Sequence, residues 1–244
     1  MGLIDSALSS SPDIARAKAG ALIAVLPIGA VEQHGPHLPL LTDTILATGI
    51  ARRIADAIAA WLLPALAYGD AWTAEGWAGT LSIAPQTLRI NVEDIGRGVQ
   101  RIGVAGLVTI NGHFGNRGPI AAAAETLSAS RLPMLTLDYP GLEAAAEKYC
   151  SSKPAGTGFY HADEVETSMM LALAPEAVRM ERAVAEYPTF PSDFGTRAMQ
   201  LSSFNTSGVF GDPRGATAET GEKIIAYIVT ESLTQIAKWS ESLK

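Results

Sequence analysis

The side chains best suited to bind a cation are concentrated in one short segment, GAVEQHGPHLPLLTDT at residues 29–44. Glu32 and His34 are two residues apart, so in an extended backbone their side chains leave the same face and can bind one ion. Asp43 follows a turn rich in glycine and proline, at the start of a predicted helix. Asp43 is either a helix cap, a role also open to Thr42, or a further ligand.

The four histidines of the chain, His34, His37, His113 and His161, all lie in predicted loops, near glycine or an acidic residue. For any one of them a hydrogen-bonded structural role is the default. As a set, together with the nearby carboxylates, they favour a divalent metal site with mixed carboxylate and imidazole ligands, for which Zn, Mn and Fe are all suitable. The clusters contain no cysteine, which excludes a structural zinc site of the thiolate type.

Two further segments carry candidate residues. His113 lies in INGHFGNRG, where Gly112 lets the backbone approach a ligand and the next helix directs N–H groups at negative charge. The segment has no Walker lysine and no complete G-x-G-x-x-G, so it is not a phosphate-binding loop of that kind. In YHADEVETSMM, His161 precedes Glu164 and Glu166, which are either capping or dipole partners of a helix or functional acids.

Short apolar runs alternate with amphipathic patterns and predict the elements that must position these residues. The runs predict strands at 21–28, 62–69, 106–112 and 133–140, and the amphipathic patterns predict helices at 42–61, 87–103, 116–130, 164–174 and 217–239. Continuous rather than alternating hydrophobicity favours burial of both strand faces. We therefore expect an α/β fold, a three-layer α/β/α sandwich with a mostly parallel sheet. Ligands bind such sheets beyond the carboxyl ends of the strands, where the candidate residues fall.

Composition indicates a single globular domain, residues 1–244, because 48% of the residues are apolar and 18% are charged. The net charge of −7 and the lack of a basic run make nucleic acid an unlikely partner by composition. No apolar run is long enough to cross a bilayer and the N-terminal residues do not resemble a signal peptide, so we expect a cytoplasmic protein without a membrane partner. The single cysteine, Cys150, cannot form an internal disulfide.

Residues 185–216 are rich in proline, glycine, serine and phenylalanine and predict a long irregular region. Such regions in compact domains are commonly functional or pack against another subunit. The apolar and aromatic residues of this region therefore predict a homo-oligomer.

Five segments, in order between about residues 25 and 240, resemble the creatininase (creatinine amidohydrolase) family: LPIGAVEQHGPHLPLLTDT, GTLSI, NGHFGN, HADEVETSMMLALAPEAV and GVFGDPRGATAETG. Known members are metal-dependent hydrolases of small C–N bonds, among them creatinine amidohydrolase, a formamide deformylase and the peptidase of mycofactocin maturation. Their folds are α/β and they are typically hexameric. The resemblance implies two divalent metal ions per subunit and a small-molecule amide substrate.

Carried over by motif, the resemblance implies that Glu32, Asp43 and His113 hold one metal ion. His34 and the shared Asp43 would hold the other ion. Creatininase takes a further ligand from a glutamate two positions after the histidine of its NGH segment, a position that is Gly115 here.

Three residues are candidates for the missing ligand and for proton transfer. Glu166 is the expected replacement for the ligand absent at Gly115, with Glu164 or solvent as alternatives. His161 is expected to protonate the leaving nitrogen, because its titration range suits that step near pH 7. The two glutamates are the candidates for a proton shuttle.

Departures from the family pattern concern the substrate. The stretch PAGTGFYHADE lacks the tryptophan that creatininase closes over its substrate ring, and Thr73 and Ala74 stand where many members have an acid and a histidine. Trp72 and Trp77 either line the pocket or are structural aromatics. We therefore expect a metal-dependent amidohydrolase acting on a small amide, cyclic or linear. The alternatives are a formamide deformylase, a mycofactocin-type peptidase and a catalytically silent metal-binding oligomer.

Overall fold

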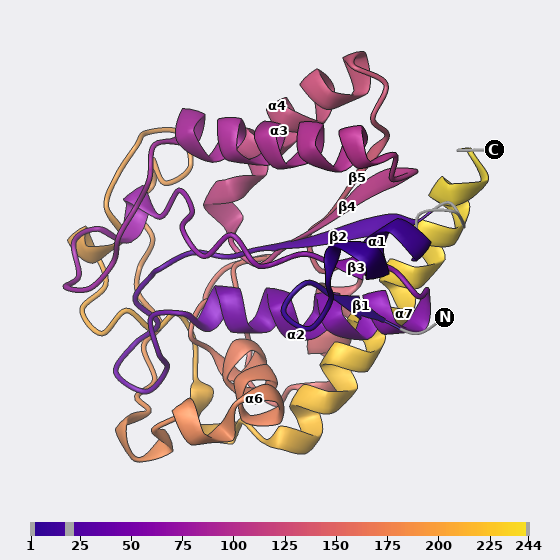
Figure 1. Ribbon diagram of the computed structural model, residues 1–244. Coiled ribbons are helices and arrows are strands. Elements are labelled where there is room, and N and C mark those ends of the chain that lie inside the picture. The colour runs from indigo at the N-terminus through magenta and orange to yellow at the C-terminus, as the bar shows by residue number, and fades with distance from the viewer. Residues whose placement is uncertain (1–2, 18–21, 243–244) are drawn as a thin grey trace.

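A five-stranded parallel sheet forms the centre of the protein (Figure 1). The computed structural model describes residues 3–17 and 22–242. The strands occur in the order β1-β3-β2-β4-β5, and every pair is parallel. They are β1 (Ile4–Asp5), β2 (Ile23–Ile28), β3 (Trp61–Leu62), β4 (Gly106–Asn111) and β5 (Met134–Leu137). The prediction of a mostly parallel sheet is confirmed; residue 21 of the first predicted strand lies outside the described residues.

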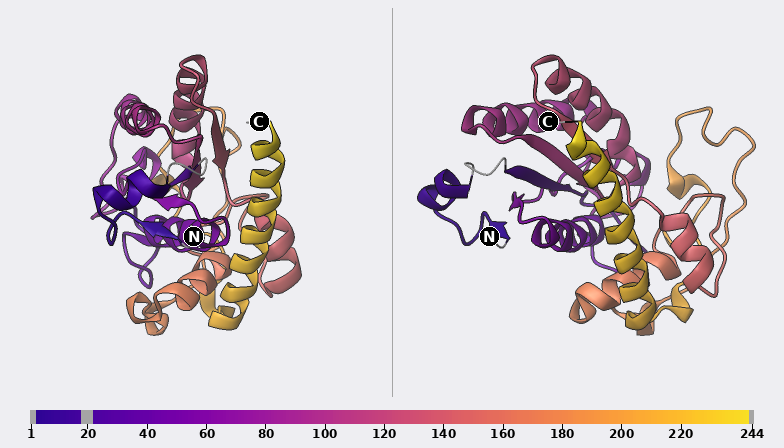
Figure 2. Two further views of the ribbon diagram at one scale, coloured as in Figure 1. Left: turned by 45° about the vertical axis from the view of Figure 1, so that its right-hand side comes forward. Right: turned by 90° about the vertical axis from the view of Figure 1, so that its right-hand side faces the viewer.

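Helices cover both faces of the sheet, as Figures 1 and 2 show. They are α1 (Ser11–Ala17), α2 (Thr42–Ala57), α3 (Pro85–Ile102), α4 (Arg117–Ala129), α5 (Leu142–Tyr149), α6 (Glu164–Leu173) and α7 (Ala218–Glu241). α3 and α4 pack together on one face, whereas α2, α6 and α7 pack together on the other. The fold is therefore the expected three-layer α/β/α sandwich. Among the described residues, no helix combines the length and apolar character needed to span a bilayer.

Both faces of the central strand β2 are buried, which explains why its apolar residues do not alternate with polar ones. Ala24, Leu26 and Ile28 pack into a core with α3 and α4, whereas Val25 packs into a second core with α2, α6 and α7. Successive side chains of a strand point to opposite faces, and both faces are covered here. The same burial on both sides positions the carboxyl end of β2, from which the candidate residues continue.

Three predicted elements are clearly shorter than expected. The strand expected at 133–140 is limited to β5, Met134–Leu137. The strand expected at 62–69 pairs as β3 only at residues 61–62, followed by an isolated bridge between Leu66 and Ile28. Pro64 lies between them and has no N–H to donate to a ladder. The helix expected at 42–61 ends at Ala57, because Ala59 adopts a φ of 52° that a right-handed helix cannot contain.

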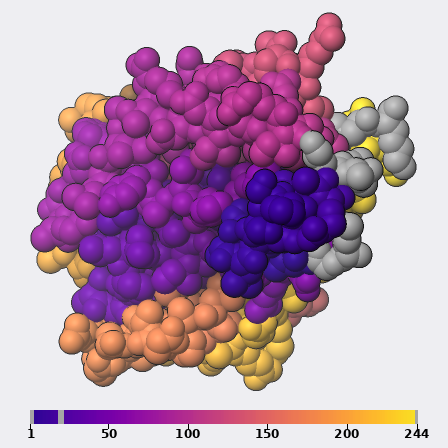
Figure 3. All heavy atoms as spheres, in the orientation of Figure 1, coloured from indigo at the N-terminus to yellow at the C-terminus, as the bar shows by residue number. Residues whose placement is uncertain are grey.

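The sequence analysis missed three elements, β1, α1 and α5, and correctly predicted an irregular region at 185–216, which contains no helix longer than a single turn. Four aromatic residues of this region, Phe190, Phe194, Phe204 and Phe210, pack within the chain in one cluster with Phe159. Tyr187 of the same region is 52% exposed. The homo-oligomer expected from this region stays a prediction. Figure 3 shows one face of the molecule, on which the indigo N-terminal segment lies between the magenta segment above it and the orange and yellow segments below it.

Candidate metal centre

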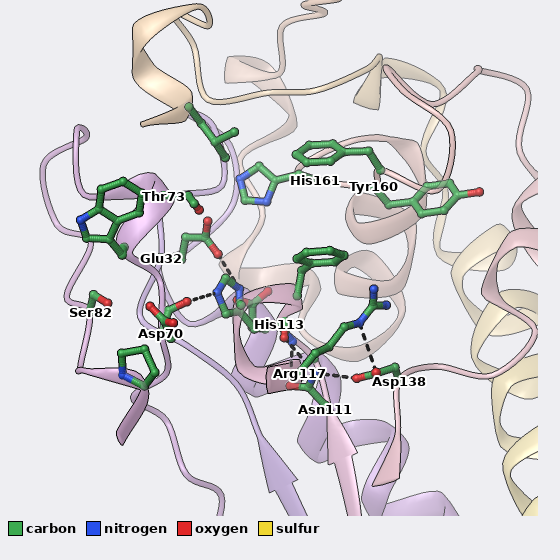
Figure 4. A pocket seen from close by; sticks show the side chains of 18 of the residues that line it. Glu32, Asp70, Thr73, Ser82, Asn111, His113, Arg117, Asp138, Tyr160 and His161 are labelled. Atoms are coloured by element: carbon green, nitrogen blue, oxygen red, sulfur yellow. Dashed lines mark hydrogen bonds and ion pairs between the residues drawn. The ribbon is translucent and has the colours of Figure 1, made fainter. Parts of the chain in front are cut away.

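The candidate residues lie where the helical connections of two neighbouring strands diverge. β2 and β4 are adjacent, and the helices that follow them, α2 and α4, pack on opposite faces of the sheet. Such a switch point leaves a crevice at the carboxyl ends of the strands. A cavity of about 810 Å³ opens there and is lined by Glu32, Asp43, His113, His161 and Glu166, among others. Figure 4 shows Glu32 and His113 meeting in this cavity, with His161 opposite them.

The first group of converging ligand atoms consists of Glu32, Asp43 and His113, all buried. Nδ1 of His113 lies 2.8 Å from Oε2 of Glu32 and 3.1 Å from Oδ2 of Asp43. The other ring nitrogen of His113, Nε2, lies 2.8 Å from the carbonyl oxygen of Asp70, to which it can only donate. A neutral ring therefore keeps its proton on Nε2 and directs the lone pair of Nδ1 at the two carboxylates.

The second group consists of His34, Asp43 and Glu166, again all buried. Nδ1 of His34 lies 3.1 Å from the carbonyl oxygen of Glu32, so the neutral ring carries its proton there. Nε2 is thereby free to bind a cation, and it lies 3.0 Å from Oδ1 of Asp43 and 3.6 Å from Oε2 of Glu166. The structure thus brings together the two ligand sets expected from the sequence, with Glu166 in the second.

Asp43 connects the two groups, because its Oδ2 faces His113 and its Oδ1 faces His34. Neither Asp43 nor Thr42 caps the helix. The residue preceding α2 is Leu41, and no side chain caps this end of the helix. Thr42 donates its hydroxyl hydrogen to the carbonyl oxygen of Pro39 instead. Asp43 therefore lies inside the first turn of α2 with both carboxylate oxygens directed at the site.

The unsatisfied polar atoms of the site fit divalent cations. Oε2 of Glu32, Nε2 of His34 and Oδ2 of Asp43 are buried and make no hydrogen bond of acceptable geometry. Buried polar atoms in proteins are normally hydrogen-bonded, and three orphaned ones at adjacent positions need an explanation. Carboxylate oxygens and imidazole nitrogens whose lone pairs converge on common points are the donor set of Zn and Mn sites.

The buried carboxylates require positive charge beside them. Burial by itself would raise the pKa of Asp43, but His34 and His113 hold it below its usual range. Burial by itself would lower the pKa of His34, but the carboxylates of Asp43 and Glu166 raise it to about 10. The pKa of His113 is likewise raised well above its usual value, because Glu32 and Asp43 outweigh burial. Without cations, protons on these two histidines supply the compensating charge.

Cation binding is therefore expected to release protons. The raised pKa values of His34 and His113 keep both rings protonated at pH 7, and burial raises the pKa of Glu166 to about 8, so this carboxyl group is also largely protonated there. Two cations must therefore displace about three protons per chain. The apparent affinity for the cations should accordingly rise with pH up to about pH 10, the pKa of His34. Isothermal titration in two buffers with different heats of ionisation measures the number of protons released. A His34→Asn variant should release fewer protons, and equal heats in both buffers would contradict the expectation.

Gly115 lies where the local packing leaves no space for a side chain. A Cβ atom at Gly115 would overlap the carbonyl of Asp70, the same group that orients the ring of His113. A larger residue there would push Asp70 away from His113. The packing around position 115 therefore leaves no space for a carboxylate side chain. The carboxylate of Glu166, from α6, lies in the second group.

The carboxylate of Glu164 lies outside the site, against Ser151 and Ser152. This carboxylate accepts hydrogen bonds from the backbone N–H groups of Ser151 and Ser152, at 3.0 and 2.6 Å. It belongs to none of the ligand groups formed by the described residues and does not line the cavity. Asp163 caps α6 by accepting hydrogen bonds from the N–H groups of Val165 and Glu166. Of the acidic residues in this segment, only Glu166 lies within the site.

His161 lies beside the second group, with its ring 4.4 Å from the ring of His34, centroid to centroid. It also forms a third group of converging buried ligand atoms, with Glu32 and His34. Its Nε2 is 2.9 Å from the side-chain amide nitrogen of Gln33, whose other contacts, to the N–H of Gly35 and the carbonyl of Gly208, fix the orientation of the amide. Nε2 of His161 therefore accepts from Gln33. Burial and the neighbouring His34 lower the pKa of His161 to about 4, below the range expected from the sequence.

Sequence reasoning missed Gln33, Asp70 and Asn111. Gln33 and Asn111 belong to the quoted EQH and NGH segments, so their positions within these motifs were the available signal. Asp70 acts through its backbone carbonyl, for which a sequence carries no signal. Of the two tryptophans, Trp72 lines the cavity, whereas Trp77 donates its indole N–H to the carbonyl of Thr206.

Several known proteins are similar to this chain in sequence. Residues 7–236 match the family described as "Creatininase: Creatinine amidohydrolase". The chain is 36% identical over 230 residues to a mycofactocin precursor peptide peptidase of Mycobacterium tuberculosis, covering 88% of this chain and 84% of that protein. It is 30% identical over 237 residues to a creatinine amidohydrolase of Pseudomonas putida, covering 88% of each.

Solved structures of creatininases have a similar fold. A creatinine amidohydrolase superposes with a TM-score of 0.88 at 29% identity, over 97% of both chains. A creatininase variant described as of the Zn–Zn type gives a TM-score of 0.87 at 27% identity, over 98% of both chains. One described as creatininase Mn gives 0.84 at 27% identity, over 97% of this chain and 98% of that one. With the family match spanning most of its length, the chain belongs to the creatininase (creatinine amidohydrolase) family.

Proposed function

We propose that this chain hydrolyses an amide C–N bond with the help of two divalent cations. The observation that carries the proposal is the position of Asp43, whose two oxygens each face a different buried histidine within a ligand group. Two cations bound there would supply an activated water as nucleophile and polarise the amide carbonyl. Relatives described as Zn–Zn and Mn creatininases make Zn and Mn the first candidates, with Fe also compatible with the donor set.

His161 is proposed to move the proton. Its lowered pKa keeps the ring neutral at pH 7, and Gln33 orients the ring by donating to Nε2. For proton transfer Nε2 would exchange this contact for one with the attacking water, accept its proton, and then pass that proton to the leaving nitrogen. Glu166 is proposed to complete the second cation site. Glu164, held by Ser151 and Ser152, has no part in this scheme.

The substrate is proposed to be a small amide, processed as in creatinine amidohydrolase. A second candidate, hydrolysis near the end of a peptide, is favoured by two observations. Identity to the mycofactocin peptidase is 36%, against 30% to the creatinine amidohydrolase. The cavity of about 810 Å³ also lies in the upper part of the range of small-molecule pockets, ~300–1,000 Å³, and leaves room for more than a single small ring.

An assay of the cation-loaded chain tests the proposal. The protein, loaded in turn with Zn, Mn and Fe, is expected to hydrolyse at least one of three classes: creatinine, N-formyl compounds and short peptides. Hydrolysis of creatinine is followed as ring opening to creatine, and hydrolysis of the other two classes as release of an amine. Activity should fall to background after chelation and return when the cation is restored. A chain that binds two cations but hydrolyses none of these classes would instead be a silent metal-binding protein. Which class is cleaved separates the small-amide reading from the peptidase reading.

A further inference from the structure

Arg117 lies in the same cavity as the metal centre but has no role in binding cations. It is the first residue of α4, four positions after His113, and lines the cavity together with Phe114. Figure 4 shows its side chain extending alongside Asp138, with the terminal nitrogens directed toward the side of the cavity where Tyr160 lies. A cationic group at this place faces the space that a substrate would occupy.

The guanidinium is held from two sides. Its Nε lies 3.1 Å from Oδ2 of Asp138, and its Cζ lies 4.4 Å from the centre of the Phe114 ring. Asp138 is in turn fixed by Asn111, which donates to its Oδ1 at 2.6 Å and to the carbonyl of His113 at 2.8 Å. Arg117 is therefore positioned relative to the metal ligand His113 through a short chain of polar contacts.

The terminal nitrogens of Arg117 are available to a ligand. Within the part of the chain that the structure describes, the guanidinium forms an ion pair only with Asp138, in which Nε lies 3.1 Å from the carboxylate. The side chain is 51% exposed, although it lies in the cavity wall. A guanidinium fork held in place with its terminal N–H groups free matches the two oxygens of a carboxylate.

We infer that Arg117 binds a carboxylate group of the substrate, so that the substrate is an amide that also carries a carboxylate. This inference rests on the proposed function and narrows its substrate class. A singly charged carboxylate suits the site better than a doubly charged phosphate, because Asp70, Glu75 and Asp138 also line the cavity and repel added negative charge. The simpler alternative is that Arg117 only forms a surface ion pair with Asp138, a type of contact that contributes little.

Equilibrium binding of a matched pair of ligands separates these readings. N-acetylphenylalanine and N-acetylphenylalaninamide differ only in the carboxylate, and their ring suits a cavity wall that includes Trp72 and Tyr160. Their affinities for the Zn-loaded protein are measured by isothermal titration. We expect the wild type to prefer the carboxylate form by roughly 10- to 100-fold, as charge-assisted hydrogen bonds allow, and Arg117→Met to lose most of that preference. Any preference that remains in Arg117→Met reports carboxylate bound directly to the cations.

Arg197 provides the matched control, because it lines the same cavity but pairs with Asp193 at 2.7 Å. Arg197→Met should keep the wild-type preference. The inference is overturned if the wild type shows no preference, if Arg117→Met retains it, or if Arg197→Met abolishes it instead. Because binding needs no turnover, an Arg117-dependent preference in a protein that hydrolyses nothing would refute the proposed function and leave the carboxylate site standing. Hydrolysis without such a preference would support the proposed function and refute the carboxylate site.

Discussion

Replacement of Asp43 by alanine is expected to remove both cations and to lower kcat by roughly 10³-fold or more. Asp43 is common to the group with Glu32 and His113 and to the group with His34 and Glu166, and each of its oxygens faces a different histidine. Its loss also leaves His34 and His113 with one fewer carboxylate to balance their charge. Cations supply several kcal/mol of transition-state stabilisation, and each 1.36 kcal/mol corresponds to about tenfold in rate. Elemental analysis of the purified variant, together with kcat on whichever amide the wild type cleaves, measures both effects.

Two other variants make the result specific. His113→Ala removes a ligand of the first group only, so it should retain one cation where Asp43→Ala retains none. His37→Gln is the matched histidine control, because His37 is buried beside the site but its Nε2 contacts the hydroxyl of Thr167, 2.9 Å away, rather than a ligand group. It should keep both cations. An Asp43→Ala protein that is folded, fully loaded and active would refute the shared-ligand assignment.

Replacement of Gly221 by alanine is expected to lower the free energy of unfolding by about 1–3 kcal/mol or more. Gly221 lies in the first turns of α7, where a Cβ atom would overlap the backbone carbonyl of Ser168 in α6. Backbone cannot move aside as a flexible side chain can, so the two helices must separate. Urea denaturation of the cation-free protein measures the loss. Because α6 also carries Glu166, we further expect weaker binding of the second cation.

Gly98→Ala is the matched control for the helical glycine. Gly98 lies within α3, and its Cβ would meet only the end of the Arg101 side chain, 3.7 Å away. Here the added methyl group should stabilise the protein by about 0.5–1 kcal/mol, because glycine is the poorer helix former. Equal effects of the two substitutions would mean that the close approach of α6 and α7 does not limit stability.

Much of the fold followed from local patterns. The apolar runs at 21–28 and 106–112 became β2 and β4 because an apolar run of strand length is stable only when both of its faces are covered. The parallel order of strands then brings their carboxyl ends to one edge, so the segments that contain Glu32 and His113 had to meet there. The spacing of Glu32 and His34 was also readable, because it depends on local backbone geometry alone.

The sequence analysis favoured Glu166 over Glu164 as the replacement ligand, but residue type by itself does not decide between them, because both begin the same helix and have the same chemistry. Side chains two positions apart in a helix point about 200° away from each other, so Glu166 can face the ligand groups while Glu164 faces Ser151. Which of the two faces the ligand groups depends on how α6 is rotated against α2 and α7, and that rotation is fixed by packing between segments far apart in the sequence.

The same limit applies to the rest of the site. A sequence specifies that Gly115 has no side chain, but only the folded chain shows the carbonyl of Asp70 occupying that space. It specifies an arginine at 117, but only the fold brings Asp138, from the end of another strand, against it. The sequence by itself determined the donor atoms and the edge of the sheet where they gather, since these follow from residue type and strand period. The tertiary structure decided which of them face one another, since contacts between distant segments depend on the packing of the whole core.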